Sequence, residues 1–210
     1  MIRRLLDKFL HVAQNRTQVA YDATFFTEAW FRNWAELQPV LWALIAAQPR
    51  WRAVLDYGCG AGAMVDPMND EGYRYIGCDR SVEARTLYLR HFGRHPGRFL
   101  TDLSEALTEE FDLALAFDVF EHMADDEIRI FLQETQAIPE FFVNISRERG
   151  LPGHINIKSD KQWIALCESS GLSLDANTTD LLRRRYCELR PRRSDLWHKN
   201  LFVFSRTTGQ

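Results

Sequence analysis

A glycine-rich turn that directly follows a short apolar run constrains this chain more than any other feature. Residues 53–56 read Ala-Val-Leu-Asp, and Gly58, Gly60 and Gly62 follow at alternate positions. Glycine permits the sharp turns and close backbone approaches that a bound ligand requires, and the free amide groups at the start of a helix attract an anion. The segment therefore predicts a strand, a ligand-binding turn and a helix, the opening unit of a doubly wound α/β fold.

Short apolar runs alternate with helix-like segments from residue 51 onward. The predicted strands are 53–56, 73–78, 98–100, 111–117 and 140–145, and the predicted helices between them include 81–92, 121–136 and 159–170. This alternation is typical of a parallel sheet that is covered on both faces and binds ligands at the carboxyl ends of its strands. Two further runs, 172–174 and 200–205, have no clear helix between them. They predict a hairpin, which would make the last strand antiparallel to the rest.

The N-terminal segment reads as helical and is rich in aromatic side chains. Phe26, Trp30 and Trp34 fall on one helical face, and Pro39 is expected to begin a second segment. Four of the six tryptophans lie at or before residue 51. These aromatic side chains either pack between a helix and the sheet or form a lid over the ligand site.

The bulk composition is that of one globular domain of 210 residues, with 46% hydrophobic and 26% charged residues. The net charge of −3 gives no general attraction to nucleic acid or to an anionic membrane. No apolar stretch approaches the length of a membrane span, and the four widely spaced cysteines favour free thiols over a zinc cluster. We expect a cytoplasmic protein with a helical cap (residues 1–50) and a ligand-binding domain (residues 51–210), and the sequence leaves a homodimer open.

Two motifs resemble those of a known enzyme family. Residues 54–62, which run Val-Leu-Asp-Tyr-Gly-Cys-Gly-Ala-Gly, resemble motif I of class I S-adenosylmethionine (SAM)-dependent methyltransferases. Residues 117–123, Phe-Asp-Val-Phe-Glu-His-Met, resemble the fourth-strand signature of small-molecule methyltransferases, including those of quinone biosynthesis. The resemblance covers residues 51–206. It implies SAM as the cofactor and a Rossmann-like α/β fold, with a seven-stranded, mostly parallel sheet whose last strand is antiparallel.

The resemblance also implies which residues hold the cofactor. Asp56 would reach toward the methionine amino group, Asp79 would bind the ribose hydroxyls and Asp102 would lie near the adenine amine. The full implied set is Asp56, Gly58, Cys59, Gly60, Gly62, Asp79, Arg80, Asp102, Leu103, Phe117 and Asp118. Each acidic residue also has an ordinary alternative role, which is a turn for Asp56, a solvated strand end for Asp79 and a helix N-cap for Asp102.

Two histidines are the candidate catalytic residues. Methyl transfer from SAM is an in-line displacement, so a base is needed only where the acceptor must lose a proton. His122, just past the fourth predicted strand, and His154, in the loop after the fifth, are placed for that role, although each also has a structural alternative. Asp118, Glu121 and His122 resemble the Glu-x-x-Glu-His metal motif of some quinone and RNA-end methyltransferases, with Asp in place of the first Glu. We expect no metal, because many relatives carry Glu-His without one.

The methyl acceptor is the least constrained part of the prediction. The absence of an Asn/Asp-Pro-Pro-Tyr/Phe motif after the fourth strand argues against methylation of adenine or glutamine amino groups. A group of arginines is either a solvated loop or a clamp for a substrate carboxylate or phosphate; its members are Arg183, Arg184, Arg185, Arg190, Arg192 and Arg193. We predict methyl transfer to an oxygen or nitrogen nucleophile of a small molecule. The arginines are compatible with an anionic substrate, and we expect no nucleic acid partner.

Two other functions stay open. The glycine turn and Asp79 also permit an NAD(P)-dependent oxidoreductase, although no Tyr-x-x-x-Lys pair of a short-chain dehydrogenase is present. The chain would alternatively be a non-catalytic binding protein that keeps the methyltransferase fold. Pro67 favours that second alternative, because it is expected to shorten or kink the helix after the glycine turn.

Overall fold

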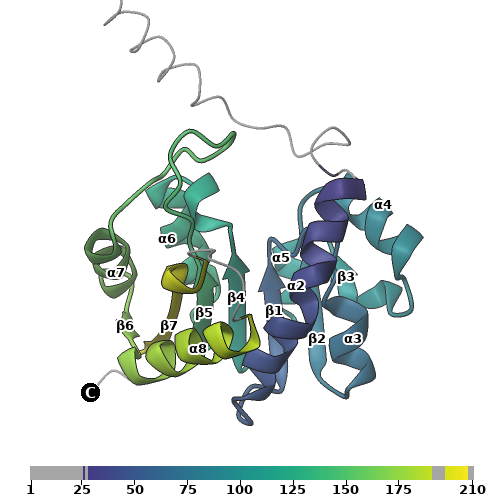
Figure 1. The fold of residues 1–210 in the computed structure, drawn as a ribbon, viewed down its shortest axis with the longest axis horizontal. Helices are drawn as coiled ribbons and strands as arrows, with labels where there is room; N and C mark the ends of the chain where they lie inside the picture. Colours follow the sequence, from purple (N-terminus) through teal and green to yellow (C-terminus); the bar gives the residue numbers. More distant parts are fainter. Residues whose placement is uncertain (1–25, 27, 191–196, 208–210) are drawn as a thin grey trace, which may run out of the picture.

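The fold is a seven-stranded sheet with helices on both faces (Figure 1). The computed structural model describes residues 26, 28–190 and 197–207, and the side chains of residues 28–35 are outside this description. The predictions for Trp30, Trp34, Arg192 and Arg193 therefore lie outside the described residues.

The order of the strands in the sheet is β3-β2-β1-β4-β5-β7-β6. The strands are β1 (Ala53–Tyr57), β2 (Arg74–Cys78), β3 (Phe99–Leu100), β4 (Leu113–Phe117), β5 (Glu140–Asn144), β6 (Leu172–Leu174) and β7 (Leu201–Arg206). The first five run parallel, and β7 is antiparallel to both of its neighbours. The predicted Rossmann-like sheet with an antiparallel last strand is confirmed. The order reverses between β1 and β4, which is where such sheets bind ligands.

Alternate residues of the central strands enter two separate hydrophobic cores. One core lies under α2 (Glu28–Ala46), α3 (Val65–Asp70), α4 (Val82–His91) and α8 (Ala176–Leu189). The other lies under α5 (Leu103–Ala106), α6 (Asp125–Glu134) and α7 (Asp160–Glu168). In β4, for example, Leu113 and Leu115 face the first core, whereas Ala114 and Ala116 face the second. Three short 3-10 helices complete the fold: η1 (Pro96–Arg98), η2 (Phe120–His122) and η3 (Trp197–Asn200).

The strands β6 and β7 pair antiparallel as predicted, but the segment between them is the helix α8, so they do not form a simple hairpin. Thr179, Leu182 and Tyr186 recur at helical spacing and are the buried residues of α8. The side chain of Asp175 caps the helix by accepting a hydrogen bond from the backbone N–H of Thr178 (2.9 Å). Because most other positions of α8 are polar or charged, its narrow apolar stripe gives a weak signal in the sequence. Figure 1 shows α2 and α8 lying across the same side of the sheet.

Pro39 lies inside α2 and does not begin a new segment as predicted. A proline in a helix interior removes one backbone hydrogen bond at a cost of about 3 kcal/mol. Here the helix continues for two more turns, in which Leu41, Leu44 and Ile45 are buried against the sheet. Tertiary packing thus outweighs the local cost. In the described ranges, no helix is both long enough and apolar enough to cross a membrane, and all four cysteines are free thiols, as predicted.

The helix after the glycine turn is short, as expected, but Pro67 is not what ends it. Pro67 is the third residue of α3, where the helix needs no backbone N–H from it. The helix ends just before Gly72, whose φ of 81° is typical of the residue that terminates a helix.

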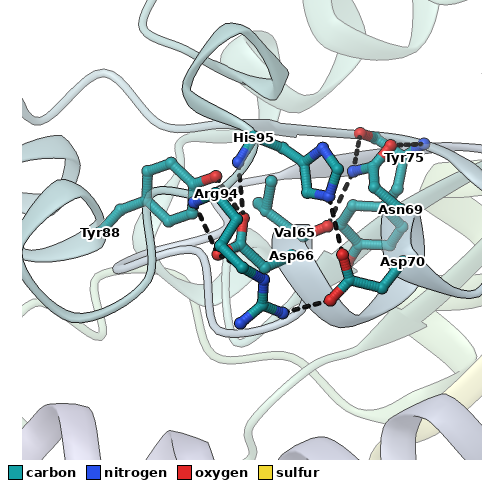
Figure 2. A network of polar contacts seen from close by, with 8 residues as sticks. All are labelled: Val65, Asp66, Asn69, Asp70, Tyr75, Tyr88, Arg94 and His95. Carbon is teal, nitrogen blue, oxygen red and sulfur yellow. Dashed lines mark hydrogen bonds and ion pairs between the residues drawn. The ribbon is translucent and has the colours of Figure 1, made fainter.

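A buried carboxylate fixes this short helix to the segment that follows α4 (Figure 2). Asp66 is fully buried and accepts hydrogen bonds from the Tyr88 hydroxyl (2.6 Å) and from the backbone N–H groups of Arg94 (3.0 Å) and His95 (3.1 Å). Asp70, one turn further, pairs with the side chains of Arg94 and His95 at the surface. The network holds α3, and with it the glycine turn, in a fixed position.

Replacing Asp66 with alanine should destabilise the protein by about 2–4 kcal/mol, because it leaves one buried and two partly buried donors without an acceptor. The midpoint of urea-induced unfolding measures this loss. Asp70→Ala is the matched control, since it removes a carboxylate from the same helix at an exposed position, and its midpoint should change much less. Equal midpoints for the Asp66→Ala variant and the unmodified protein would show that the network does not contribute to stability.

Candidate functional site

A cavity of about 1250 Å³ lies at the carboxyl ends of the central strands. Pockets for one small ligand usually measure about 300–1000 Å³, so this cavity has room for two molecules side by side. One part of its wall follows β1, β2 and β3, and the other follows β4 and β5 and includes η3. All of the implied cofactor residues line the cavity except Gly62 and Asp102.

The glycine turn passes close beneath neighbouring side chains. Gly58, Gly60 and Gly62 all have positive φ, at 71°, 55° and 64°. A Cβ on Gly58 would lie 2.6 Å from a methyl carbon of Val119, which follows β4. A Cβ on Gly62 would lie 2.8 Å from the ring of Phe99 in β3. Gly58 therefore shapes the cavity floor, whereas Gly62 serves the packing of the turn against the sheet.

Asp56 is a buried carboxylate at the end of β1. Its Oδ2 accepts a hydrogen bond from the hydroxyl of Tyr75 (2.7 Å), which lies on the neighbouring strand β2. Burial raises the pKa of Asp56 to about 7, and the hydrogen bond from Tyr75 opposes that effect only in part. A carboxylate in this state is stabilised by a ligand that brings a positive charge into the cavity.

Asp79 connects the glycine turn to the segment after β2. Its Oδ2 accepts a hydrogen bond from the backbone N–H of Gly60 (2.9 Å), and its Oδ1 accepts one from the backbone N–H of Ser81 (2.9 Å). Burial raises the pKa of Asp79, while these two hydrogen bonds lower it. Each carboxylate oxygen keeps a further lone pair for a ligand hydroxyl, and Arg80 lines the cavity beside it.

Asp102 has the alternative role that the sequence allowed. Its carboxylate caps α5, accepting hydrogen bonds from the backbone N–H (2.8 Å) and the hydroxyl (2.7 Å) of Ser104. Its side chain is exposed and is not part of the described cavity wall, which Thr101 and Leu103 reach on either side of it. The implied contact between Asp102 and adenine therefore has no support, and Thr101 takes its place in the wall.

Asp118 combines backbone strain with an unsatisfied carboxylate. It follows Phe117 at the end of β4, and its φ of 54° is the only positive value at a non-glycine residue in the described ranges. The indole N–H of Trp197 donates a hydrogen bond to Oδ2 (3.3 Å), whereas Oδ1 is buried without a hydrogen-bond partner among the described residues. Burial raises the pKa of Asp118 to about 6. Such a group is available to a donor on a bound ligand.

The two candidate histidines come together across the cavity wall. The rings of His122 and His154 lie edge to face with centroids 4.7 Å apart. His122 Nδ1 is 2.9 Å from the carbonyl oxygen of Gly153, and His154 Nδ1 is 2.9 Å from that of Glu148. A carbonyl oxygen only accepts, so we assign the proton of each ring to Nδ1 and a lone pair to Nε2. Burial lowers the pKa of His122 to about 4 and also lowers that of His154, which keeps both rings neutral at neutral pH.

Glu121 adds a third potential metal ligand beside the histidines. Its side chain is fully buried, with Oε1 accepting a hydrogen bond from the backbone N–H of Ser146 (2.9 Å) and Oε2 without a partner among the described residues. One potential ligand atom each from Glu121, His122 and His154 lies within 4.8 Å of the others. Asp118 is not part of this group. Two residues of the motif, Glu121 and His122, together with His154 therefore fit a divalent metal ion, although the sequence led us to expect none.

Sequence reasoning missed much of the wall on the other side of the cavity. Trp197 from η3 packs edge to face against Phe117, with ring centroids 5.8 Å apart, and stacks on Tyr186 of α8. Arg147 and Lys199 bring positive charge to the same wall. These residues come from separate parts of the chain and share no motif. From the predicted N-terminal cap, Phe26 and Leu41 line the cavity.

None of the described members of the arginine cluster lines the cavity as a substrate clamp would. The Arg183 side chain donates hydrogen bonds to the carbonyl oxygens of Leu201 (3.0 Å) and Lys199 (3.2 Å). Arg185 pairs with Glu188 on the surface of α8 (3.0 Å). Arg183, Arg184 and Arg185 do not contribute to the cavity wall as described.

Comparison with known proteins agrees with this geometry. Residues 26–140 match the model of a protein family described as "Methyltransferase domain". A ubiquinone biosynthesis O-methyltransferase from Chelativorans sp. (strain BNC1) is 34% identical over 83 residues, which are 37% of this chain and 32% of that protein. The match thus spans about a third of that relative's length.

Solved structures show the same fold at low identity. A TehB-like SAM-dependent methyltransferase from Corynebacterium glutamicum ATCC 13032 has a TM-score of 0.59 and 20% identity, over 86% of this chain and 97% of that one. A magnesium protoporphyrin IX methyltransferase from Synechocystis PCC 6803 with bound SAM has a TM-score of 0.57 and 13% identity, over 95% and 91%. Because the family model covers more than half of the sequence, the chain belongs to the methyltransferase domain family of class I SAM-dependent methyltransferases.

Proposed function

We propose that this protein is an enzyme that transfers the methyl group of SAM to an oxygen or nitrogen nucleophile of a small molecule. The observation that carries the proposal is a single cavity that joins two sites. One wall is the glycine turn with Asp56 and Asp79, and the other holds the paired histidines. Family membership supports SAM as the cofactor. The chemistry of the wall that holds the paired histidines supports the proposed class of acceptor.

The cofactor side divides into three contacts. The carboxylate of Asp56 binds the methionine ammonium group, because a buried acid with a raised pKa favours a cationic partner. Asp79 accepts hydrogen bonds from the ribose hydroxyls with the lone pairs that Gly60 and Ser81 leave free. Leu103 and Thr101 provide the wall for adenine.

The methyl group then faces the wall formed by Phe117, Asp118 and His122. In the transfer, the acceptor atom forms a bond to the methyl carbon while the carbon–sulfur bond breaks, and S-adenosylhomocysteine leaves with the sulfur electron pair. A proton on the nucleophile passes to an Nε2 lone pair of His122 or His154 and then to solvent. A divalent metal ion held beside them would supply an alternative, by lowering the pKa of a bound acceptor hydroxyl.

An anionic group on the acceptor would bind to Arg147 and Lys199 rather than to the arginines of α8. Arg147 lines the cavity, and Asp160 neutralises it at 2.8 Å. Lys199 also lines the cavity, and it forms no ion pair with any residue in the described ranges. Lys199 is therefore the stronger candidate for the contact with a carboxylate or phosphate.

Isothermal titration calorimetry on the purified protein tests the proposal, with SAM, S-adenosylhomocysteine, NAD and NADP as ligands. We expect the first two to bind and the dinucleotides not to bind. Transfer of a labelled methyl group to a panel of hydroxylated and amino compounds then identifies the acceptor class. Binding of NAD alone would favour the oxidoreductase. Binding of SAM without turnover of any acceptor would favour the non-catalytic alternative.

A further inference from the structure

We infer that Glu121 is a positioning residue that holds the loop of residues 146–156, and that this loop is the wall that selects the methyl acceptor. The selection of an acceptor rests on the proposed function, whereas the anchoring of the loop is independent of it. Glu121 does not line the cavity as described, so its effect on an acceptor passes through the residues that it holds.

Both ends of the loop are attached to Glu121. At the start of the loop, the backbone N–H of Ser146 donates a hydrogen bond to Oε1 of Glu121 (2.9 Å). At its end, the backbone N–H of Asn156 donates one to the carbonyl oxygen of Glu121 (3.0 Å). The side chain of Glu121 is fully buried, so removing it leaves the N–H of Ser146 without its acceptor. Loops whose ends lie this close together form compact units and frequently carry function.

The residues that follow Glu121 hold the same loop. His122 Nδ1 lies 2.9 Å from the carbonyl oxygen of Gly153. The side-chain amide of Asn156 donates hydrogen bonds to the carbonyl oxygen of Met123 (2.9 Å) and to the carboxylate of Asp125 (2.8 Å), the first residue of α6. The loop is thus fixed along one short segment after β4, and that segment also lines the cavity.

The anchored loop brings charged and apolar side chains to the cavity. Arg147 and Glu148 line the cavity near the start of the loop, and Leu151 lines it further along. Leu151 is 41% exposed, and Ile130 of α6, which lines the same cavity, is 54% exposed. Exposed apolar side chains in a cavity wall favour a ligand whose apolar surface covers them. We therefore expect the loop to contact an apolar part of the acceptor through Leu151.

The first test compares two replacements of Glu121 that differ in whether they keep the acceptor for Ser146. Glu121→Ala removes it and should speed trypsin cleavage after Arg149, an exposed residue of the loop, by at least about tenfold. The KM for the panel compound with the highest turnover should rise by at least about tenfold, with a smaller change in kcat and a SAM affinity within about threefold of the unmodified protein. Glu121→Gln keeps an oxygen that accepts from Ser146 and should restore all of these values.

Two further variants decide the question if Glu121→Ala fails to fold by circular dichroism. Asn156→Ala loosens the other end of the loop from a half-buried position and should change the cleavage rate and the KM in the same direction. Leu151→Ser should raise the KM by about fivefold through lost apolar contact, while the anchor stays intact. Leu181→Ser is its matched control, because Leu181 is equally exposed on α8 and does not line the cavity as described.

Three results would overturn the inference. If the alanine variants fold and the cleavage rate after Arg149 stays unchanged, Glu121 does not anchor the loop. If Glu121→Gln is as impaired as Glu121→Ala, the charge of the carboxylate matters rather than its position as an acceptor. If the loop variants lower kcat at constant KM, the loop does not select the acceptor. A protein whose loop responds to trypsin as expected but that methylates no compound of the panel would confirm the anchor and count against the proposed function.

Discussion

Replacing Asp79 with alanine should lower the affinity for SAM by at least about a hundredfold, which is close to 3 kcal/mol. The substitution removes the acceptor for the ribose hydroxyls. It also removes the hydrogen bonds that fix the N–H groups of Gly60 and Ser81, at 2.9 Å each. Hydrogen bonds to a charged group are among the stronger polar contacts, at about 1.5–3 kcal/mol each. Calorimetric titration with SAM at fixed pH measures the effect.

Asp102→Ala is the control that makes this prediction specific. Both residues are aspartates that follow strands of the same sheet, and the family resemblance implied a cofactor contact for each. The structure separates them, because Asp102 caps α5 with an exposed side chain, away from the described cavity wall. We expect its removal to change SAM affinity by less than about threefold, as for an ordinary surface substitution. Equal losses in the two variants would restore Asp102 to the adenine site, and no loss in Asp79→Ala would exclude the ribose contact.

The central sheet could be predicted from the sequence because its signals are local. The strands β1, β2, β4 and β5 are short apolar runs that end in a turn or an acidic residue, and the helix α6 between β4 and β5 has a clear apolar stripe. The glycine turn is equally local, since three alternate glycines with positive φ leave few conformations open. These local features also predict where the cofactor side of the cavity lies.

Features that depend on packing between distant segments could not be predicted. The helix α2 continues through Pro39 because the residues after it are buried against the sheet. The helix α8 forms although its sequence is mostly polar, because Leu182 and Tyr186 reach the core. Trp197 enters the cavity wall through contacts with Phe117 and Tyr186 that no spacing in the sequence reveals. The acceptor side is built mainly from such residues, which is why the sequence constrains the cofactor more than the substrate.

The affinity for SAM should rise by about thirtyfold between about pH 5.5 and about pH 8, because SAM binds best when Asp56 is ionised. Burial raises the pKa of Asp56 to about 7 in the ligand-free protein, so most molecules carry a protonated Asp56 at the acid end of this range. The methionine ammonium group favours the ionised form, and binding must displace the proton. Calorimetry across the range measures the slope, and a flat profile would place the ammonium group elsewhere.

The Asp56→Asn variant separates the contribution of Asp56 to the pH dependence of SAM affinity from the contributions of the other acidic residues at the site. Asp79 and Asp118 also have raised pKa values and contribute to the profile at its acid end. The asparagine keeps an oxygen that accepts a hydrogen bond from the hydroxyl of Tyr75, so the local packing is preserved. The variant should bind SAM weakly at about pH 8 and should lose most of the dependence on pH above 6, where Asp56 accounts for the largest part of it.

The same substitution should stabilise the ligand-free protein, which distinguishes a binding role from a structural one. Asp56 ionises near pH 4 in the unfolded chain and near pH 7 in the folded chain, so the folded state holds a proton that the unfolded state has lost. Its contribution to stability therefore decreases as the pH rises through this window and is lost above about pH 7. Asp56→Asn removes that penalty, and at about pH 8 its thermal unfolding midpoint should exceed that of the unmodified protein. A variant that lost both SAM affinity and thermal stability would show instead that Asp56 maintains the fold, and the cavity would then need another partner for the cofactor's positive charge.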